Sequence, residues 1–360
     1  MQFQVGSRTV GGANPCFIVA EAGVNHNGDL SLAKQLIEAA AKAKVDAVKF
    51  QLLKADSLYV KDAGTWKTDF NEEFDIHGVW KKTEMPLSWI SELKEYADEK
   101  NLIFFSSVFD EQGADFINPY VGIYKIASSE LSHIPLLKHV AKKKKPIIIS
   151  IGGATMAEVQ EAITVVKETG NNAIALLYCV PIYPTPLDKA NVKALETLRK
   201  KFPDIVVGYS DHSLDPVAVP RAAISYGAKI IEKHFTLSKA MLGIDHKMSL
   251  EPKELNAMVS EIRKAEADLT HGTLVINSKA IGDGIIHPGD AKMSFLRRKI
   301  FAIQTILKGQ QLTKNNIAVL RPGNRDVTNG LHPSQFEALL GKKASRDISA
   351  LKVMTKEDVE

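Results

Sequence analysis

Short apolar runs alternate with amphipathic segments eight times between residues 16 and 234, and this alternation most constrains the fold. Runs that are apolar throughout are typical of parallel strands covered by helices on both faces. Eight such units in about 250 residues predict a (β/α)8 TIM barrel. A doubly wound open sheet is the alternative, but no glycine-rich phosphate fingerprint follows the first strand. The strands are expected to end near Ala20, Phe50, Phe105, Ile126, Ile149, Leu177, Val207 and Ile231.

Three segments depart from this alternation. Residues 54–85 form a connection too long for a simple turn, and such loops in barrels often shape or cover the mouth. Residues 271–292 are rich in Gly, Asn and Asp without periodicity, which indicates a linker. Residues 293–360 show short strands and single helical turns. We therefore expect a barrel over 1–270, a linker over 271–292 and a small separate domain over 293–360.

The composition excludes several classes of protein. The 360 residues are 45% hydrophobic, which is enough for a large core. No apolar run approaches the roughly 20 residues that span a bilayer, so no membrane partner is expected. The net charge of +4 is small, which argues against nucleic acid. Cys16 and Cys179 both lie in apolar runs, and the first residues carry no secretory signal, so we expect reduced core thiols and a cytoplasmic protein.

Polar side chains follow every expected strand. In a barrel the active site lies at the carboxyl ends of the strands, so these side chains should converge on one rim. Any one of them alone is more often structural, but a coincidence on all eight strands indicates a site. In chain order they are Glu21, Lys49, Gln51, Ser106, Ser107, Lys125, Ser128, Glu130, Ser150, Tyr183, Ser210, Asp211, His212, Lys233 and His234.

Two histidines on neighbouring strands predict a metal site. His212 and His234 each follow a short apolar run, and a polar turn with Asp245 comes next. Two isolated histidines more often only hydrogen-bond within the fold. Here each lies among Ser, Asp and Lys at a strand end, which favours a divalent metal held by neutral imidazole.

The remaining rim residues predict an anionic substrate. Lysines and serines can hold a phosphate and a carboxylate. A metal can polarise a carbonyl oxygen, while Glu21 and Glu130 can move protons or orient water. Together these groups suggest condensation of phosphoenolpyruvate with an aldehyde.

Several motifs resemble one known family across nearly the whole chain. The stretches are FIVAEAGVNHNGDL, YKIASSE, YPTP, GYSDHSLDP, IIEKHFTL and DHKMSLEP, and the tail carries LRPGN. They resemble the N-acetylneuraminate (sialic acid) synthases, a family of nonulosonate synthases that ends in an antifreeze-like (SAF) domain. The resemblance implies a phosphoenolpyruvate-dependent condensation with an N-acetylated hexosamine, foremost N-acetylmannosamine. It also implies a divalent metal, Mn²⁺ or Mg²⁺, and a domain-swapped homodimer.

The resemblance also implies a role for individual residues. His212 and His234 would be the metal ligands, and Glu21, Glu130 and Lys49 would be catalytic. Phosphoenolpyruvate would be held by Lys49 together with Ser107, Lys125, Ser128, Ser150 and Ser210. The sugar would meet Gln51, Tyr183, Asp245 and, from the tail, Phe295 and Arg321.

Two departures from the family pattern leave the substrate open. Pro181 stands where the family often carries Asn or Ser, and residues 54–85 follow no family pattern. The pair Asp245-His246 resembles sialic and legionaminic acid synthases, whereas SSVFD and SSELSHIPLLK resemble pseudaminic acid synthases. A diacetamido sugar is therefore the alternative substrate.

Two other functions are compatible with parts of the sequence. Lys125 or Lys49 could form a Schiff base in a barrel aldolase, provided that burial lowers its pKa. The tail could also belong to an ice-binding protein, but it is basic, whereas an ice-binding face should be flat and weakly charged.

Overall fold

The computed structural model describes residues 1–68, 70–287 and 296–360. Its larger part is a closed barrel of eight parallel strands in the order β10-β11-β12-β3-β4-β7-β8-β9. This confirms the predicted TIM barrel. The strands are β3 (Phe17–Gly23), β4 (Ala47–Leu52), β7 (Ile103–Val108), β8 (Tyr124–Ile126), β9 (Ile147–Ser150), β10 (Ile174–Tyr178), β11 (Val206–Asp211) and β12 (Ile230–His234).

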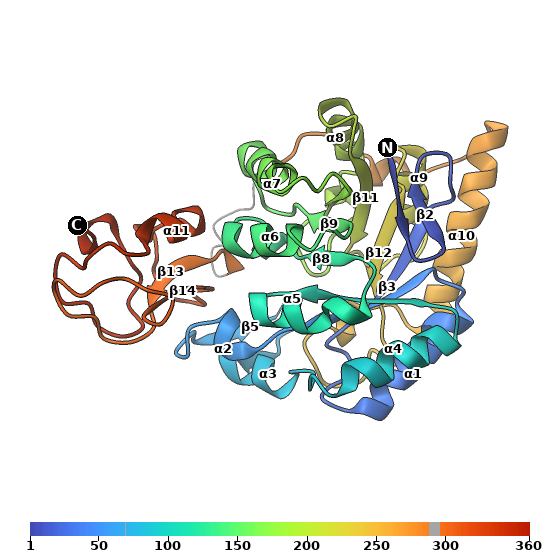
Figure 1. Cartoon of the computed structure of the whole chain (residues 1–360). Helices are drawn as coiled ribbons and strands as arrows, with labels where there is room; N and C mark the ends of the chain where they lie inside the picture. The colour runs from blue at the N-terminus through green and yellow to red at the C-terminus, as the bar shows by residue number, and fades with distance from the viewer. Residues whose placement is uncertain (69, 288–295) are drawn as a thin grey trace.

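Helices surround the barrel as the apolar spacing predicts (Figure 1). Helix α1 buries Ala33, Ile37 and Ala40 toward the sheet, and Asp29 caps its first turn. The helices of the barrel part are α1 (Leu30–Lys42), α2 (Ala55–Leu58), α3 (Ile76–Lys82), α4 (Trp89–Glu99), α5 (Glu111–Ile117), α6 (Ile134–Ala141), α7 (Met156–Glu168), α8 (Ala194–Lys201), α9 (Ala218–Ser225) and α10 (Pro252–His271). Among the described residues, no helix has the length and apolar character needed to cross a membrane.

Three antiparallel pairs lie outside the barrel sheet in the described part of the chain, and two of them precede the C-terminal domain. An N-terminal hairpin, which the sequence did not predict, joins β1 (Gln2–Val5) and β2 (Arg8–Gly11). The second pair, β5 (Thr65–Lys67) and β6 (Glu73–Asp75), belongs to the long connection after β4. That connection contacts the C-terminal domain, because the amide of Val60 donates to the Arg321 carbonyl at 3.1 Å. The loop thus contacts the C-terminal domain, and a role for it in shaping the mouth of the barrel stays a prediction.

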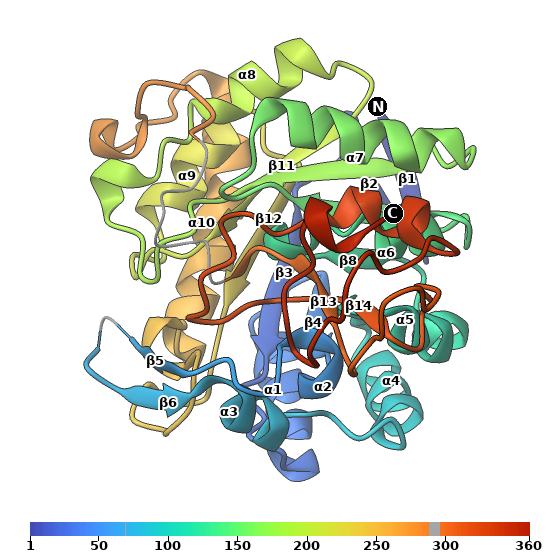
Figure 2. The same ribbon diagram turned by 90° about the vertical axis from the view of Figure 1, so that its left-hand side faces the viewer.

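The C-terminal domain has its own apolar core. It contains β13 (Lys299–Ala302), β14 (Ile317–Leu320) and α11 (Phe336–Leu339), and its buried centre includes Ile300, Ile317 and Phe336. A second apolar cluster joins this domain to the barrel loops through Tyr59, Phe109, Phe301 and other residues. Turned by 90°, the molecule shows the domain in front of the barrel, near α2 and α6 (Figure 2).

Part of the predicted linker packs on the barrel. The amides of Val192 and Lys193 donate to the carbonyls of Ala280 and Ile281 at 3.0 and 2.9 Å. The Asn191 side chain donates to the Ile285 carbonyl at 2.8 Å. Residues 280–286 are therefore held along the barrel surface rather than spanning open space. Both cysteines are buried and unpaired, as predicted.

Close packing inside the barrel predicts a strong effect at Gly208 on β11. A Cβ atom there would lie 2.3 Å from the Ile230 carbonyl oxygen and 2.7 Å from a Leu177 methyl carbon. We expect Gly208→Ala to lower the free energy of unfolding by about 1–3 kcal/mol, because the backbone must shift. Denaturant unfolding measures this. Gly122→Ala is the matched control, since its nearest atom would be 3.7 Å away; equal stability of the two variants would contradict the prediction.

Candidate functional site

A cluster of buried lysines and carboxylates lies inside the barrel at the carboxyl ends of its strands. The Lys49 Nζ is 2.7 Å from Glu21 Oε2 and 3.6 Å from Glu232 Oε2. The Lys125 Nζ is 3.7 Å from Glu232 Oε1. The strand register explains this grouping, because Glu21 pairs with Lys49, and Ser210 pairs with Glu232. All four charged groups are at most 4% exposed, so they interact in a poorly solvated space.

Serine hydroxyls surround these charges. Ser107 Oγ accepts a hydrogen bond from Lys49 Nζ at 3.0 Å, and Ser210 Oγ donates to Glu232 Oε1 at 3.0 Å. Ser150 Oγ is buried without a hydrogen-bond partner. Ser106 instead donates to the Phe50 carbonyl, so Ser107 is the serine that faces the cluster, as the sequence analysis placed it. A buried hydroxyl without a partner can donate to a ligand.

The charges shift one another's pKa values. Burial raises the pKa of Glu21, and the positive charge of Lys49 only partly opposes this. For Lys49 burial acts downward, but Glu21 and Glu232 outweigh it and raise its pKa. Burial lowers the pKa of Lys125, and the nearby Lys49 adds to the effect. Lys125 is thus the less compensated cation, and an anionic ligand would stabilise its charge.

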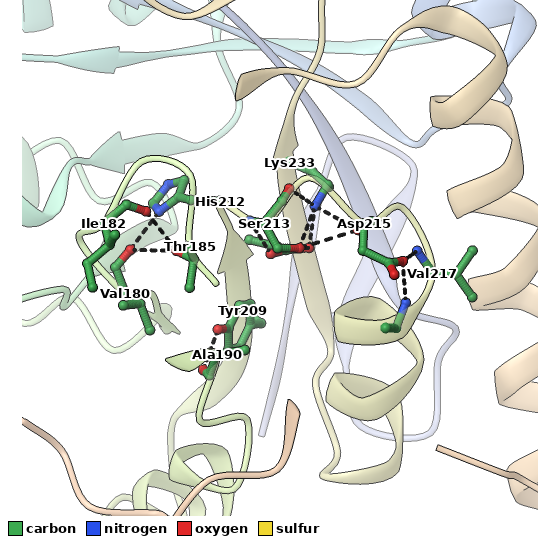
Figure 3. Close-up of polar contacts among 12 residues, drawn as sticks. Val180, Ile182, Thr185, Ala190, Tyr209, His212, Ser213, Asp215, Val217 and Lys233 are labelled. Atoms are coloured by element: carbon green, nitrogen blue, oxygen red, sulfur yellow. Dashed lines mark hydrogen bonds and ion pairs between the residues drawn. The ribbon is translucent and has the colours of Figure 1, made fainter. Parts of the chain in front are cut away.

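The two predicted metal-ligating histidines face each other. Their ring centroids are 5.8 Å apart, and the ring of Tyr183 lies 4.3 Å from that of His212. His212 Nδ1 is 3.0 Å from the Val180 carbonyl oxygen, which favours a proton on Nδ1 and a lone pair on Nε2 (Figure 3). His234 Nδ1 makes no hydrogen bond and lies 3.6 Å from Asp245 Oδ2.

The state of these histidines fits metal ligation. Burial lowers the pKa of both His212 and His234, so both are neutral near pH 7. Within residues 1–68, 70–287 and 296–360, no three His, Cys, Asp or Glu side chains gather closely enough to hold a metal ion by themselves. A metal at this position would therefore have two imidazole ligands and would complete its coordination with water or substrate.

Three residues predicted to contact the sugar lie near the two histidines or Glu21. Gln51 donates to Glu21 Oε1 at 2.9 Å. Asp245 is buried, and burial together with the charge of Glu21 raises its pKa to about 7. Tyr183 contacts His212 as described above. Tyr183 and Asp245 thus each contact one of the two histidines, and Gln51 contacts Glu21, which pairs with His234 between β3 and β12.

The C-terminal domain adds arginines to the mouth of the barrel. Arg321 Nη2 is 2.6 Å from Glu130 Oε1 and 2.5 Å from Ser129 Oγ. Glu130, which the sequence analysis placed as a catalytic group, is therefore engaged between the domains. Ser128 lines a cleft at this junction together with Gly152 and Arg297. Phe295, the other predicted residue of the tail, lies outside the described residues.

Two charged residues of the site were not predicted from the sequence. Glu232 was overlooked beside Lys233, although it shares a strand face with His234 two residues later, and this alternation could have identified it. Lys233 points to the other face, where it contacts Asp211 at 2.5 Å and the carbonyls of Ser213 and Asp215 (Figure 3). Arg298 is fully buried and contacts Glu130, and nothing in the local sequence indicates this.

Two family models match the chain. The NeuB family matches residues 36–273, and the SAF domain matches residues 297–360. The spore coat polysaccharide biosynthesis protein SpsE of Bacillus subtilis is 44% identical over 355 residues, which cover 97% of this chain and 94% of SpsE. The crystal structure of SpsE aligns with a TM-score of 0.88 over 100% of this chain and 99% of that chain, at 42% identity.

Two further relatives carry names of sugar acid synthases. The N,N'-diacetyllegionaminic acid synthase of Legionella pneumophila is 38% identical and covers 99% of this chain and 98% of its own length. The crystal structure of the N-acetylneuraminic acid synthetase of Leptospira borgpetersenii, in complex with citrate, is 35% identical with a TM-score of 0.70. It covers 77% of this chain and 93% of that chain.

Proposed function

Because the chain belongs to the NeuB family of synthases, we propose that it condenses phosphoenolpyruvate with an N-acetylated hexosamine, foremost N-acetylmannosamine, to form a nonulosonic acid and phosphate. The single observation that supports this most is the buried pair of lysines at the strand ends, with Lys125 only partly compensated by Glu232. A doubly charged anion such as phosphoenolpyruvate would supply the missing negative charge. Ser150, whose hydroxyl has no partner, would donate to the same anion.

The lysines, the serines and Glu21 can support each step of this reaction. The terminal carbon of phosphoenolpyruvate bonds to the aldehyde carbon of the open sugar, and water adds at the carbon that carries the phosphate. The proton that the water loses is matched by the proton that the aldehyde oxygen takes up to become a hydroxyl, and phosphate leaves with the C–O bonding electrons. Lys125 and the serines would bind the phosphate, and Lys49 would bind the carboxylate. Glu21, with a raised pKa beside Gln51, is suited to orient the attacking water and accept its proton.

A divalent metal, Mn²⁺ or Mg²⁺, is part of the proposal. His212 and His234 would hold it, since both are neutral and His234 Nδ1 has no hydrogen bond. When bound, such a metal polarises a carbonyl oxygen as a Lewis acid. The chain's own residues would still bind both substrates and orient them.

We predict that turnover depends on this metal. Removal of divalent ions by chelation should abolish phosphate release, and titration with Mn²⁺ should restore it. His234→Gln should bind Mn²⁺ more weakly than the unaltered chain in calorimetry, because one of two imidazole ligands is lost. Full turnover by metal-free protein would contradict the proposed metal.

A panel of N-acetylated sugars tests the function itself. The protein is incubated with phosphoenolpyruvate and each sugar, and released phosphate and the new acid are measured. We expect turnover with N-acetylmannosamine. If no N-acetylated sugar supports phosphate release with Mn²⁺ or Mg²⁺ present, the proposed function is wrong. Borohydride should not trap a substrate adduct, and a trapped adduct on Lys125 or Lys49 would indicate a Schiff-base aldolase instead.

A diacetamido sugar is the second candidate substrate. The relative from Legionella pneumophila, which aligns over 99% of this chain, is named for N,N'-diacetyllegionaminic acid. Higher kcat/KM with a 2,4-diacetamido sugar than with N-acetylmannosamine would assign the chain to this specificity. We also propose a domain-swapped homodimer, in which the C-terminal domain of one chain contacts the partner's barrel in the way that Arg321 contacts Glu130 within this chain.

A further inference from the structure

Arg298 connects the C-terminal domain to three loops at the mouth of the barrel. Its side chain is completely buried, and its Nε donates to Glu130 Oε2 in the loop after β8. Nη1 donates to the Ser57 carbonyl at 2.9 Å and to the Val319 carbonyl at 2.6 Å, and Nη2 donates to the Phe109 carbonyl at 3.0 Å. All three nitrogens of the guanidinium are thus engaged by fixed acceptors.

Arg321 reaches the same carboxylate but is less engaged. Its Nη2 is bonded to Glu130 and Ser129, whereas its Nη1 lies 3.5 Å from the Tyr59 hydroxyl. Its Nε is buried and has no hydrogen-bond partner. A buried donor without a partner is costly, so a ligand that accepts from it would be stabilised. The two arginines therefore differ: each nitrogen of Arg298 has a protein acceptor, whereas Nε of Arg321 has none.

The negative charge of Glu130 is shared by Arg298 and Arg321, so one arginine can turn away only if the other still compensates this charge. Burial alone would raise the pKa of Glu130, but the charges of Arg298 and Arg321 outweigh burial and hold its pKa well below the ordinary value. The third titratable neighbour, His133, lies 3.5 Å away, and burial lowers its pKa. If Arg321 turned toward a substrate, Arg298 would still compensate the buried carboxylate.

We propose that Arg298 is a positioning residue: it holds Glu130 and docks the C-terminal domain over the barrel mouth, which leaves Arg321 available to bind the sugar. Binding of the sugar by Arg321 rests on the proposed function, whereas docking of the domain by Arg298 does not. Arg298 touches no expected substrate position itself, because each of its nitrogens already has a protein acceptor.

Hydrogen exchange in the full chain tests the docking without any assay of activity. The Val60 amide donates to the Arg321 carbonyl at 3.1 Å, and the Arg321 amide donates to the Leu58 carbonyl at 2.8 Å. In Arg298→Met, peptides that contain these amides should exchange about 10-fold faster, since a buried ion pair and three carbonyl contacts are lost. The control is Lys138→Met, which removes the exposed interdomain pair with Glu337 and should leave exchange unchanged.

Steady-state kinetics test the positioning of Arg321. In Arg298→Met the KM for the sugar should rise about 10-fold, because Arg321 must then compensate Glu130 alone, while the KM for phosphoenolpyruvate stays within about 2-fold. Arg298→Lys keeps the charge but has a single donor group, so it should restore part of the exchange protection and of the sugar KM. If Arg298→Met does not fold, the same comparisons are made with Arg298→Lys.

The pH dependence of docking gives a further readout. A carboxylate whose pKa is depressed contributes stability that is present above its unfolded pKa and is lost as the pH falls through the folded pKa. Protection of the Val60 peptide should therefore persist in the unaltered chain below pH of about 4.3, the ordinary pKa of a glutamate. In the Arg298 variants it should be lost at a higher pH.

The outcomes are separable. Normal exchange, normal sugar KM and an unchanged pH limit in a folded Arg298 variant would overturn the positioning role. Absence of turnover by the unaltered chain would overturn the proposed function, while the exchange experiment would still decide whether Arg298 docks the domain.

Discussion

Arg321→Met in the full chain will lower kcat/KM for the sugar by about 10–100-fold, because a charge-assisted hydrogen bond of roughly 1.5–3 kcal/mol is lost. The unpartnered Nε of Arg321 at the mouth of the barrel is the reason for this expectation. The KM for the sugar should rise, whereas the KM for phosphoenolpyruvate should change little. Steady-state kinetics with each substrate varied in turn measures it.

Arg325→Met is the matched control for this variant. Arg325 follows Arg321 by four residues, and its ion pair with Asp62, with N and O 3.2 Å apart, is largely solvent-accessible, since the two side chains are 32% and 57% exposed. An exposed pair contributes about 0–1 kcal/mol, so kcat/KM should change little. Equal losses in Arg321→Met and Arg325→Met would show that both act through stability of the domain and that Arg321 has no specific contact with the sugar.

Mixing two inactive chains extends this prediction to the oligomer. In a domain-swapped dimer, a His234→Ala chain and an Arg321→Ala chain would form some sites with an intact barrel from one chain and an intact tail from the other. We expect part of the activity to return on mixing. If mixed dimers form and no activity returns, each site is assembled within one chain.

Lys125→Met will lower kcat/KM for phosphoenolpyruvate by about 10–100-fold, because the phosphate loses a charged partner in a poorly solvated space. Lys125 is 2% exposed and lies 3.7 Å from Glu232, which remains compensated by Lys49 and Ser210 in the variant. The barrel should therefore stay folded, which thermal unfolding will show. The KM for phosphoenolpyruvate should rise while the KM for the sugar changes little.

An unchanged KM for phosphoenolpyruvate in folded Lys125→Met would make Lys125 a structural residue of the strand end. Glu232→Gln provides the complementary test, since it removes the negative charge between the two lysines and keeps the shape of the side chain. It should strengthen binding of an anion, because Lys49 and Lys125 then lack their shared carboxylate partner.

The sequence by itself determined the barrel and most of its rim. Strands buried on both faces must be apolar throughout, so their periodic return along the chain was visible without a structure. The carboxyl ends of such strands meet at one rim, which brought together Lys49, Ser107, Lys125, Ser210 and His212 from separate parts of the sequence. Residue roles for catalysis and binding remain predictions for the experiments above.

Only the tertiary structure decided which charges meet. Glu130 and Arg298 are 168 positions apart, and no local pattern specifies that a guanidinium and a carboxylate will be buried against each other. Successive side chains alternate along a strand, so the sequence could place Glu232 and Lys233 on opposite faces of β12, but it could not show that Glu232 meets Lys49 and that Lys233 meets Asp211. Residues 280–286 lack periodicity, yet they bind along the barrel through backbone groups. Every residue carries a backbone carbonyl, so the sequence does not indicate which carbonyls will be bonded. The spacing of apolar residues along the chain predicts which side chains are buried, whereas the partner of a buried charge depends on how distant segments pack.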